Sequence, residues 1–172
     1  MKLKIKVKVI TPGCEPVFNE NGDWIDLVAA KDIEIDAPYA CRLRRNDEER
    51  TRKVVISREY VPLGIAMELP KGMEAYILPR SSTHKKYNTI QLNSKGIVDY
   101  VFKGDNDEWF IPFMAIDQSV IKKGDRVCQF RIQLSQKATV WQKIKWLLSS
   151  GVEIEFVDKL NNPNRGSSGG NK

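Results

Sequence analysis

The strongest constraint on the fold is the alternation of apolar and charged residues at the start of the chain. In MKLKIKVKVI, every second residue from Met1 to Val9 is apolar and the four residues between them are lysines. Successive side chains of a β-strand point to opposite faces, so this segment predicts a strand with one buried and one solvated face. Similar short apolar runs between turn residues follow: VPLGIAMELP, EAYILP, GIVDYVF, EWFIPFMAI, RVCQFRIQL and VEIEFVD. Such a chain is expected to fold as an all-β sandwich, jelly roll or barrel.

One segment departs from the strand pattern. In WQKIKWLLSSG, the residues Trp141, Ile144, Leu147 and Leu148 share one face of a helix, and Gly151 stands where a C-cap would. We therefore predict one short helix near 141–150, covering one end of the β core. A helix that binds a membrane surface or a partner is the alternative.

The length of 172 residues fits one domain, which we place over residues 1–160. Within it, a charged insertion at about 38–58 contains RLRRNDEERTRK, which mixes both signs of charge with almost nothing apolar. We interpret it as a solvated hairpin tip or loop, with a nucleic-acid contact as the alternative. The tail over residues 161–172, NNPNRGSSGGNK, has no apolar anchor and is expected to be mobile.

Composition excludes several classes of protein. No run approaches the roughly 18 apolar residues of a membrane span, so we expect a soluble, unprocessed protein without membrane contact. Three cysteines without metal-ligand spacing and a single histidine predict a reducing compartment and no zinc. The net charge of +6 suits an anionic partner such as a nucleotide. Because the basic and acidic residues are interleaved, direct binding of nucleic acid is not expected.

The stretch LPRSSTHKKYNTIQLNSKGIVDY holds the candidate chemistry. A turn with Arg80, Ser81 and Ser82 offers a guanidinium and two hydroxyls to phosphate oxygens. The alternative is an ordinary turn in which serine caps its own backbone. Asp99 follows an apolar run that favours burial, and a buried carboxylate needs either a salt-bridge partner or a chemical role.

These residues resemble the trimeric deoxyuridine triphosphatases (dUTPases). GDWIDLVAAKD is similar to the first motif of that family, PRSSTHKK to the second, NSKGIVDYVFKGD to the third, KGDRVCQF to the fourth, and NRGSSGG to the start of the fifth. The motifs occur in the family's order and span about residues 23–170. The resemblance implies a distorted jelly-roll β-barrel and a homotrimer with its sites at subunit interfaces, where Asp99 and Arg165 of one site come from different chains.

The resemblance also implies an activity and its residues. Family members convert dUTP and water to dUMP and pyrophosphate, which limits uracil in DNA. Mg²⁺ is held by the phosphates and, through water, by an aspartate that here is Asp26, while Asp99 matches the aspartate that activates the attacking water. The other implied contacts are Arg80, Ser81 and Ser82 to phosphates, Gln129 near the α-phosphate, and Asn93, Gly96, Ile97 and Val98 around uracil.

The chain departs from the family pattern at two places. Phe102 stands where the third motif has a tyrosine whose ring lies under the deoxyribose, and strand alternation would point Tyr100 to the same side. The fifth motif is shortened. It retains Arg165 for the γ-phosphate and Ser167 and Ser168 as hydroxyls, but no aromatic residue to close over uracil.

Two other functions remain as alternatives. A catalytically weak or silent family member could act by binding a regulatory protein. A deoxycytidine triphosphate deaminase shares the fold, but the glutamate context that the resemblance implies for it is DEWFIP here. The resemblance to bacterial and phage members places the protein in the cytoplasm of a bacterial cell or of a phage-infected host.

Overall fold

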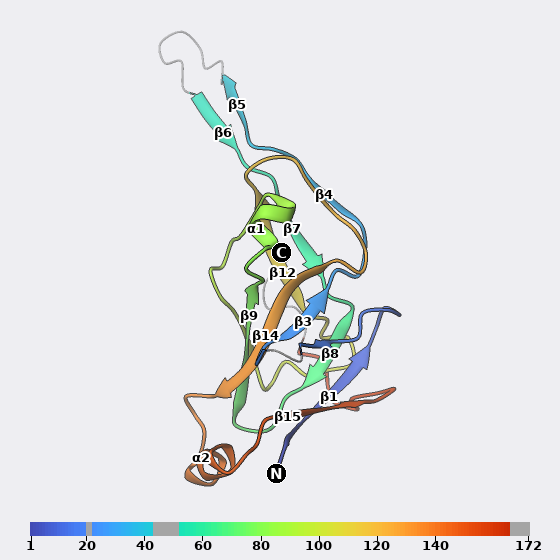
Figure 1. Ribbon diagram of the computed structural model, residues 1–172, viewed down its shortest axis with the longest axis vertical. Coiled ribbons are helices and arrows are strands. Elements are labelled where there is room, and N and C mark those ends of the chain that lie inside the picture. The colour runs from blue at the N-terminus through green and yellow to red at the C-terminus, as the bar shows by residue number, and fades with distance from the viewer. Residues whose placement is uncertain (20–21, 43–51, 166–172) are drawn as a thin grey trace.

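The structure, a computed structural model, describes residues 1–19, 22–42 and 52–165 (Figure 1). Strands dominate it. In chain order they are β1 (Leu3–Val9), β2 (Val17–Phe18), β3 (Ile25–Val28), β4 (Ile33–Ile35), β5 (Tyr39–Arg42), β6 (Arg52–Val55), β7 (Arg58–Pro62), β8 (Ile65–Glu68), β9 (Met73–Pro79), β10 (Thr89–Gln91), β11 (Gly96–Asp99), β12 (Phe110–Ala115), β13 (Ser119–Ile121), β14 (Arg126–Leu134) and β15 (Val152–Phe156). The helices are α1 (Thr83–Tyr87) and α2 (Val140–Leu147).

The strands form several small sheets that wrap around one core. The widest sheet has the order β11-β9-β14-β3-β2, and two three-stranded sheets have the orders β15-β1-β8 and β10-β12-β7. Pairing within them is antiparallel, except that β1 and β15 run parallel. This architecture confirms the prediction of an all-β, jelly-roll-like barrel. The widest sheet positions most of the candidate site residues, because β9 and β14 lie at its centre.

The alternation in β1 produces the predicted two faces. Leu3, Ile5 and Val7 are at most 1% exposed and lie in the core. The lysines face outward and neutralise carboxylates on neighbouring segments. These ion pairs are Lys4–Glu155 (3.3 Å), Lys6–Glu68 (3.2 Å) and Lys8–Asp105 (3.2 Å). Each is partly exposed, so it contributes little to stability by itself, but the Lys8 pair joins β1 to the loop before β12.

Two large aromatic rings lie at the centre of the core. Trp109 and Phe130 are at most 1% exposed and meet edge to face, with ring centroids 5.4 Å apart and an interplanar angle of 81°. Such a pair adds about 1 kcal/mol to the stabilisation from burial alone. Phe130 belongs to β14 and Trp109 directly precedes β12, so the contact locks two sheets together beneath the candidate site.

The charged insertion forms a hairpin stem. β5 and β6 pair antiparallel, from Tyr39 opposite Val55 to Arg42 opposite Arg52. This stem projects from one end of the molecule, away from the barrel (Figure 1). The expected tip, residues 43–51, lies outside the described residues. The expectation of a solvated hairpin tip or loop for the charged insertion stays a prediction.

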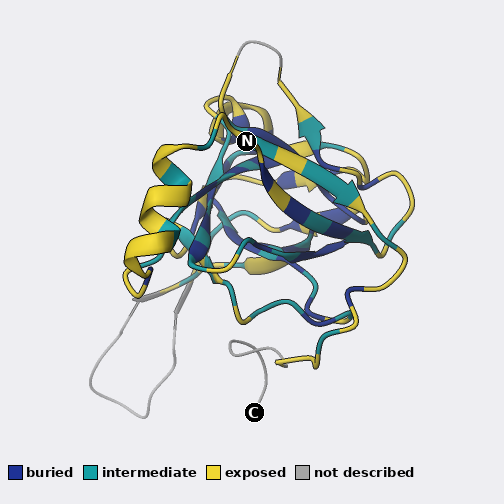
Figure 2. Ribbon diagram, turned by 90° about the horizontal axis from the view of Figure 1, so that it is seen from below, coloured by how far each residue is buried: buried dark blue, intermediate teal, exposed yellow. Residues whose placement is uncertain are grey.

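The predicted helix exists, but its packing differs from the expectation. α2 begins at a capping box between Thr139 and Gln142 and is capped at its C-terminus by Leu148, not by Gly151. Trp141 is 79% and Leu147 80% exposed, and the outer face of α2 is open to solvent (Figure 2).

The sequence predicts that this helix covers one end of the β core. That prediction is wrong for its apolar residues, because Trp141, Leu147 and Leu148 are exposed. α2 lies at the rim of the barrel, where one partly buried ring, Trp146, makes the contact with the core. No helix in the described part of the chain is long and apolar enough to cross a membrane.

Candidate active site

The first group of predicted site residues gathers around a buried carboxylate. Gln129 on β14 stands directly opposite Asp26 on β3, and a register shift between Arg126 and Cys128 bends β14 beside this pair. Asp26 is 2% exposed. Its Oδ1 accepts from Nε of Arg80 at 3.0 Å, and its Oδ2 lies 3.5 Å from Nη1 of Arg126. Two guanidiniums thus compensate a carboxylate that would be costly to bury alone.

The turn after β9 presents both predicted serines to solvent. Thr83, which is 1% exposed, holds the turn: its hydroxyl accepts from the amide of Arg80 (3.0 Å) and donates to the carbonyl of Val127 (2.9 Å). Ser82 stands at the N-cap of α1 without a side-chain capping bond. Thr83 therefore makes the side-chain hydrogen bonds that hold this turn. The hydroxyls of Ser81 and Ser82 remain exposed on the surface beside Arg80.

Sequence reasoning missed two residues of this first group. Arg126 occurs in the same KGDRVCQF segment as Gln129, and its basic character was the only available signal. Thr83 looked like part of a polar turn, because burial of a threonine depends on tertiary packing. Beside them, burial raises the pKa of the Cys128 thiol and the charge of Asp26 raises it further, so Cys128 stays protonated and has no nucleophilic role.

The second group lines a cavity of about 210 Å³ on the other side of β9. Its walls come from β11, from the residues around Trp109 and from the start of the tail. The predicted site residues that line it are Asn93, Gly96, Ile97, Val98, Asp99, Phe102 and Arg165. Ile77, Glu108, Trp109 and Phe110 complete the wall and were not predicted. None of the residues of the first group lines this cavity; these are Asp26, Arg80, Ser81, Ser82, Thr83, Arg126 and Gln129.

Asp99 is not buried, which corrects the expectation drawn from its apolar neighbours. β11 is an edge strand of its sheet, so only one of its sides is paired, and the Asp99 side chain is 57% exposed. The predicted strand over residues 96–102 also ends early. The amide of Phe102 donates to the carbonyl of Asp99 at 3.0 Å, which closes a turn through Tyr100. Tyr100 and Phe102 therefore do not alternate along a common strand.

Close backbone packing shapes the end of the cavity near Gly96. A Cβ on Gly96 would lie 3.2 Å from Cβ of Ile77 on the adjacent strand and 3.7 Å from Nδ2 of Asn93. The side-chain oxygen of Asn93 already accepts from Nε2 of Gln91 at 2.6 Å. The Asn93 side chain is thus oriented by Gln91, with its amide nitrogen near the glycine.

Arg165 reaches the same cavity from the tail of the same chain. Its Nη1 lies 3.2 Å from Oδ2 of Asp99, and its amide donates to the carboxylate of Asp107. The expectation that Asp99 and Arg165 of one assembled site belong to different chains concerns the homotrimer and stays a prediction. Ser167 and Ser168, the other tail residues that were predicted, lie outside the described residues.

Glu108, the glutamate that lines this cavity, makes a hydrogen bond to the backbone that stabilises the fold. Glu108 Oε1 accepts from the amide of Gly64 at 2.9 Å, which ties the loop before β8 to the cavity wall. A carboxylate held by a backbone amide is a poor candidate for the base of a deaminase, which must take up and release protons. The environment of Glu108 therefore gives no support to that alternative.

The acidic residues of the site are dispersed. Across residues 1–19, 22–42 and 52–165, no three His, Cys, Asp or Glu side chains are grouped closely enough to hold a metal ion. Asp26 is the one buried carboxylate in the first group. A single carboxylate beside a turn with two exposed hydroxyls fits an ion such as Mg²⁺, which keeps several waters and is bound largely by substrate phosphates.

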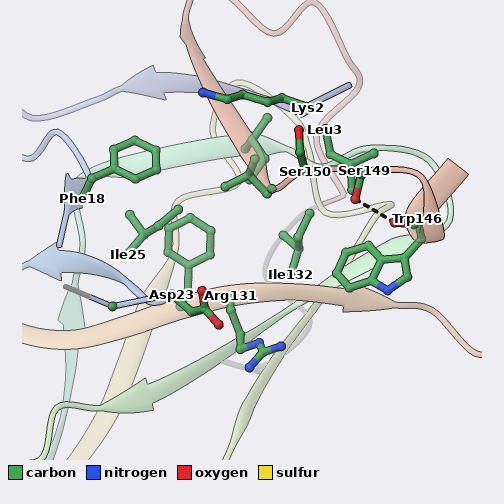
Figure 3. A pocket seen from close by; sticks show the side chains of 15 residues that line it. Lys2, Leu3, Phe18, Asp23, Ile25, Arg131, Ile132, Trp146, Ser149 and Ser150 are labelled. Atoms are coloured by element: carbon green, nitrogen blue, oxygen red, sulfur yellow. Dashed lines mark hydrogen bonds between the residues drawn. The ribbon is translucent and has the colours of Figure 1, made fainter. Parts of the chain in front are cut away.

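A larger hollow of about 560 Å³ lies elsewhere, between β1, β14 and α2 (Figure 3). Lys2, Asp23 and Arg131 stand at its edge, and Trp146 and Ile132 form its apolar wall. It contains none of the predicted site residues. The smaller cavity is the better candidate site, because seven predicted site residues line it and the Arg165 guanidinium lies 3.2 Å from the Asp99 carboxylate there.

Comparison with known proteins agrees with these features. The family model for dUTPase matches residues 46–171. The SPbeta prophage-derived deoxyuridine 5'-triphosphate nucleotidohydrolase YosS of Bacillus subtilis is 44% identical over 150 residues, covering 87% of this chain and 84% of the relative. The deoxyuridine 5'-triphosphate nucleotidohydrolase of Gloeothece citriformis is 30% identical over 98% of this chain and 94% of its own.

Solved structures show the same fold at lower identity. The dUTPase of Streptococcus mutans superimposes with a TM-score of 0.61 at 20% identity, covering 78% of this chain and 98% of that one. The dUTPase from phage phi11 of S. aureus gives 0.59 at 12% identity, covering 79% and 93%. From the family model and the prophage relative together, the chain belongs to the dUTPase family.

Proposed function

We propose that this protein hydrolyses dUTP to dUMP and pyrophosphate. The observation that carries the proposal is the cavity in which Asp99, Phe102 and Arg165 converge beside the backbone of Gly96 to Val98. The cavity has a size that suits a nucleoside, and the ring of Phe102 can lie against a sugar. The carboxylate of Asp99 and the guanidinium of Arg165 also line the cavity. The prophage relative is named for this activity, and the cavity residues come from the segments that resemble the family's motifs.

In the reaction, water attacks the α-phosphorus and the bond to the bridging oxygen of the β-phosphate breaks. Asp99 accepts the proton of the attacking water as general base, for which its exposed position at the end of β11 is suitable. Pyrophosphate leaves with the electron pair of the broken bond. Arg80, Ser81 and Ser82 contact the phosphates, and Gln129 positions the water beside the α-phosphate.

Uracil is selected by the backbone of Gly96 to Val98 together with Asn93. Backbone donors and acceptors that match uracil would leave buried groups unpaired against the exocyclic amine of cytosine. A tight wall at C5 excludes the methyl group of thymine. The Phe102 ring lies under the deoxyribose and leaves no space for a 2′-hydroxyl.

The working site is assembled between chains of a homotrimer. Asp99 on β11 stands opposite Glu74 of β9, and Gln129 on β14 lies on the other side of β9, opposite Leu78. Two strand spacings across and four residues along, the Cα atoms of Asp99 and Gln129 are about 16 Å apart. Both must reach the same α-phosphate, so the cavity of one chain is completed by the Asp26–Gln129 group of another.

Mg²⁺ is the metal that this site would use. Asp26 would hold the ion through water when incoming phosphates compete for Arg80 and Arg126. The bound ion supplies charge neutralisation for the phosphates. A structure of the phage phi11 dUTPase is described as revealing the coordination of a structural Mg(II) ion. We place the activity in the cytoplasm, where its nucleotide substrate is found.

The proposal is tested by pyrophosphate release. Purified protein with Mg²⁺ is incubated with dUTP, dCTP, dTTP or UTP, and pyrophosphate is measured. We expect release from dUTP and almost none from the other three. No release from dUTP at high protein concentration would leave the protein-binding regulator as the better account.

A further inference from the structure

At the Asn93 end of the cavity, β10 places one polar side chain in the core. Gln91 is 6% exposed and stands opposite Phe113 of β12. Its Nε2 donates to the backbone carbonyl of Ile77 at 3.3 Å and to Oδ1 of Asn93 at 2.6 Å. Both hydrogens of the Gln91 amide nitrogen therefore have an acceptor.

The backbone carbonyl of Ile77 fixes which way both side-chain amides face. A carbonyl oxygen can only accept a hydrogen bond, so the nitrogen of the Gln91 amide, and not its oxygen, must point towards it. The same nitrogen faces Asn93, where only the amide oxygen can accept. Nδ2 of Asn93 is left for the cavity, which Asn93 and Gly96 both line, and it would lie 3.7 Å from a Cβ on Gly96.

The stability of the fold does not explain a glutamine at this position. The Oε1 atom of Gln91 is buried and has no hydrogen-bond partner among the residues that the structure describes. A buried acceptor without a partner lowers stability, whereas an apolar side chain of similar size would fill the same space without that loss. The glutamine is therefore explained by what its nitrogen does to Asn93.

We propose that Gln91 is a positioning residue that sets the selectivity of the cavity for uracil over cytosine. By holding Oδ1 of Asn93, it leaves the cavity an N–H donor and no acceptor at this point. The carbonyl oxygen at C4 of uracil accepts from this donor. The amino group at C4 of cytosine is itself a donor and leaves the Asn93 nitrogen unpaired. This inference rests on the proposed function, because it names how a dUTP site rejects dCTP.

Calorimetric binding of dUMP and dCMP tests the selectivity. Gln91→Leu removes the donor at similar volume, so the Asn93 amide can turn and offer its oxygen to cytosine. We expect the Kd for dCMP to fall, the Kd for dUMP to rise no more than about twofold, and the preference for dUMP to drop about tenfold. A merely structural role would weaken the binding of both nucleotides alike. An unchanged preference, or an equal loss of affinity for both, would overturn the proposal.

Thr89→Val is the matched control. Thr89 lies two residues earlier on β10, is 2% exposed, does not line the cavity, and has a hydroxyl without a partner in the described part of the chain. Like Gln91→Leu, the change replaces a buried polar group with an apolar one of similar size. We expect a preference equal to that of wild type, and urea midpoints of both variants no lower than wild type. A control that loses preference as much as Gln91→Leu would overturn the proposal.

Two changes at Asn93 test whether Gln91 acts through it. Asn93→Asp keeps an acceptor for Gln91 and turns an oxygen towards the cavity, so the preference should shift towards dCMP although Gln91 is intact. In the Asn93→Ala background, Gln91→Leu should change the preference no further. A further tenfold loss there would mean that Gln91 does not act through Asn93. If Gln91→Leu does not fold, Gln91→Met takes its place, because methionine is unbranched and adapts to the space available.

Nuclear magnetic resonance tests the orientation of Asn93 without any nucleotide. In deuterated protein with protonated glycine, wild type should show a cross-peak between the side-chain NH₂ of Asn93 and Hα of Gly96. The cross-peak should weaken in Gln91→Leu and persist in Thr89→Val. Its absence from wild type, or full intensity in Gln91→Leu, would overturn the proposal. If wild type binds no dUMP, the proposed function fails together with the selectivity, while the cross-peak still decides whether Gln91 fixes Asn93.

Discussion

In the proposed mechanism, Asp99 is a general base at an exposed edge position. It ends an edge strand, is solvated, and has Arg165 as its ion-pair partner. A solvated carboxylate can exchange its proton with bulk water after each turnover. The arginine has a second use, because an incoming triphosphate competes with Asp99 for the guanidinium and frees the carboxylate for water.

The variant Asp99→Asn separates these roles. Asparagine keeps the shape and removes the base, so we expect turnover to fall at least about a thousandfold while the Kd for a non-hydrolysable dUTP analogue changes little. The measurements are single-turnover kinetics and calorimetric binding. An equal loss of affinity and of turnover would instead make Asp99 a structural residue.

Loss of Arg165 should affect the rate without affecting assembly. In the proposed site its guanidinium makes a charged contact to the γ-phosphate, and loss of such a contact costs about 2 to 4 kcal/mol. We therefore expect Arg165→Ala, and deletion of residues 165–172, to lower kcat/KM about a hundredfold. Ser167→Ala and Ser168→Ala should each have a much smaller effect. A truncated protein as fast as the full chain would show that Arg165 is no phosphate ligand.

At the scale of elements, the loop between β11 and β12 links β1 to the tail. Asp105 accepts from the amides of Leu160 and Asn161 and also pairs with Lys8 of β1 at 3.2 Å. The hydrogen bond from Leu160 is the largest effect and lowers the pKa of Asp105 below its usual value of 3.8; lost hydration, the second effect, opposes it, and Lys8 and the Asn161 amide lower the pKa further. The tail contact is thus tied to the charge of one carboxylate.

This link predicts a pH dependence in the acid range. Because the docked pKa of Asp105 lies below its undocked value, docking is fully stabilised above about pH 3.8 and weakens as pH falls through the docked pKa. Hydrogen exchange of the Leu160 amide, corrected for its intrinsic pH dependence, should report the loss of protection. Asp105→Asn should remove this pH dependence. Protection that persists unchanged to pH 2 would contradict it.

The helix α2 gives a stability prediction from its unusual exposure. Trp146 packs partly against the core, whereas Trp141 is 79% exposed. Trp141→Ala should change the free energy of unfolding by less than about 0.5 kcal/mol, and Trp146→Ala should lower it by about 2 kcal/mol. Urea titration of both variants is the measurement. A larger loss for Trp141→Ala would mean that another chain covers α2 in the assembled protein.

At the scale of the whole molecule, the sequence was informative where its signal is local. The alternation from Met1 to Val9 predicted the buried face of β1, because a period of two depends only on the pleat of a strand. Motif order predicted the family and most residues of the cavity around Asp99. The composition of the charged insertion predicted a solvated hairpin tip or loop, and the structure has the hairpin stem of β5 and β6 there.

Features that depend on long-range approach were not predictable. Asp99 was expected to be buried, since a sequence does not show that β11 lies at the edge of its sheet. The contact of Asp107 with Arg165 joins residues 58 positions apart, and the clash with Asn164 that Gly104 avoids exists only once the tail has docked. Likewise, Thr83 and Arg126 acquire their roles from packing against β14 and β3.

The separation of the two residue groups on one chain predicts a site shared between chains, and the resemblance to the trimeric dUTPases implies a trimer of roughly 60 kDa with cyclic symmetry. Size-exclusion chromatography with light scattering measures this mass. A stable, active monomer would contradict the shared site, because in one chain Asp99 and Gln129 are too far apart to act on one phosphate.

Reconstitution of activity from two inactive chains tests the central claim most directly. Asp99→Asn and Gln129→Ala chains are each purified, then mixed in equal amounts, unfolded and co-refolded, and pyrophosphate release from dUTP is measured. If each site combines the Asp99 cavity of one chain with the Asp26–Gln129 group of another, half of the cavities and half of their neighbours are intact. The account therefore predicts about one quarter of wild-type activity. A mixture no more active than the two separate variants would contradict it.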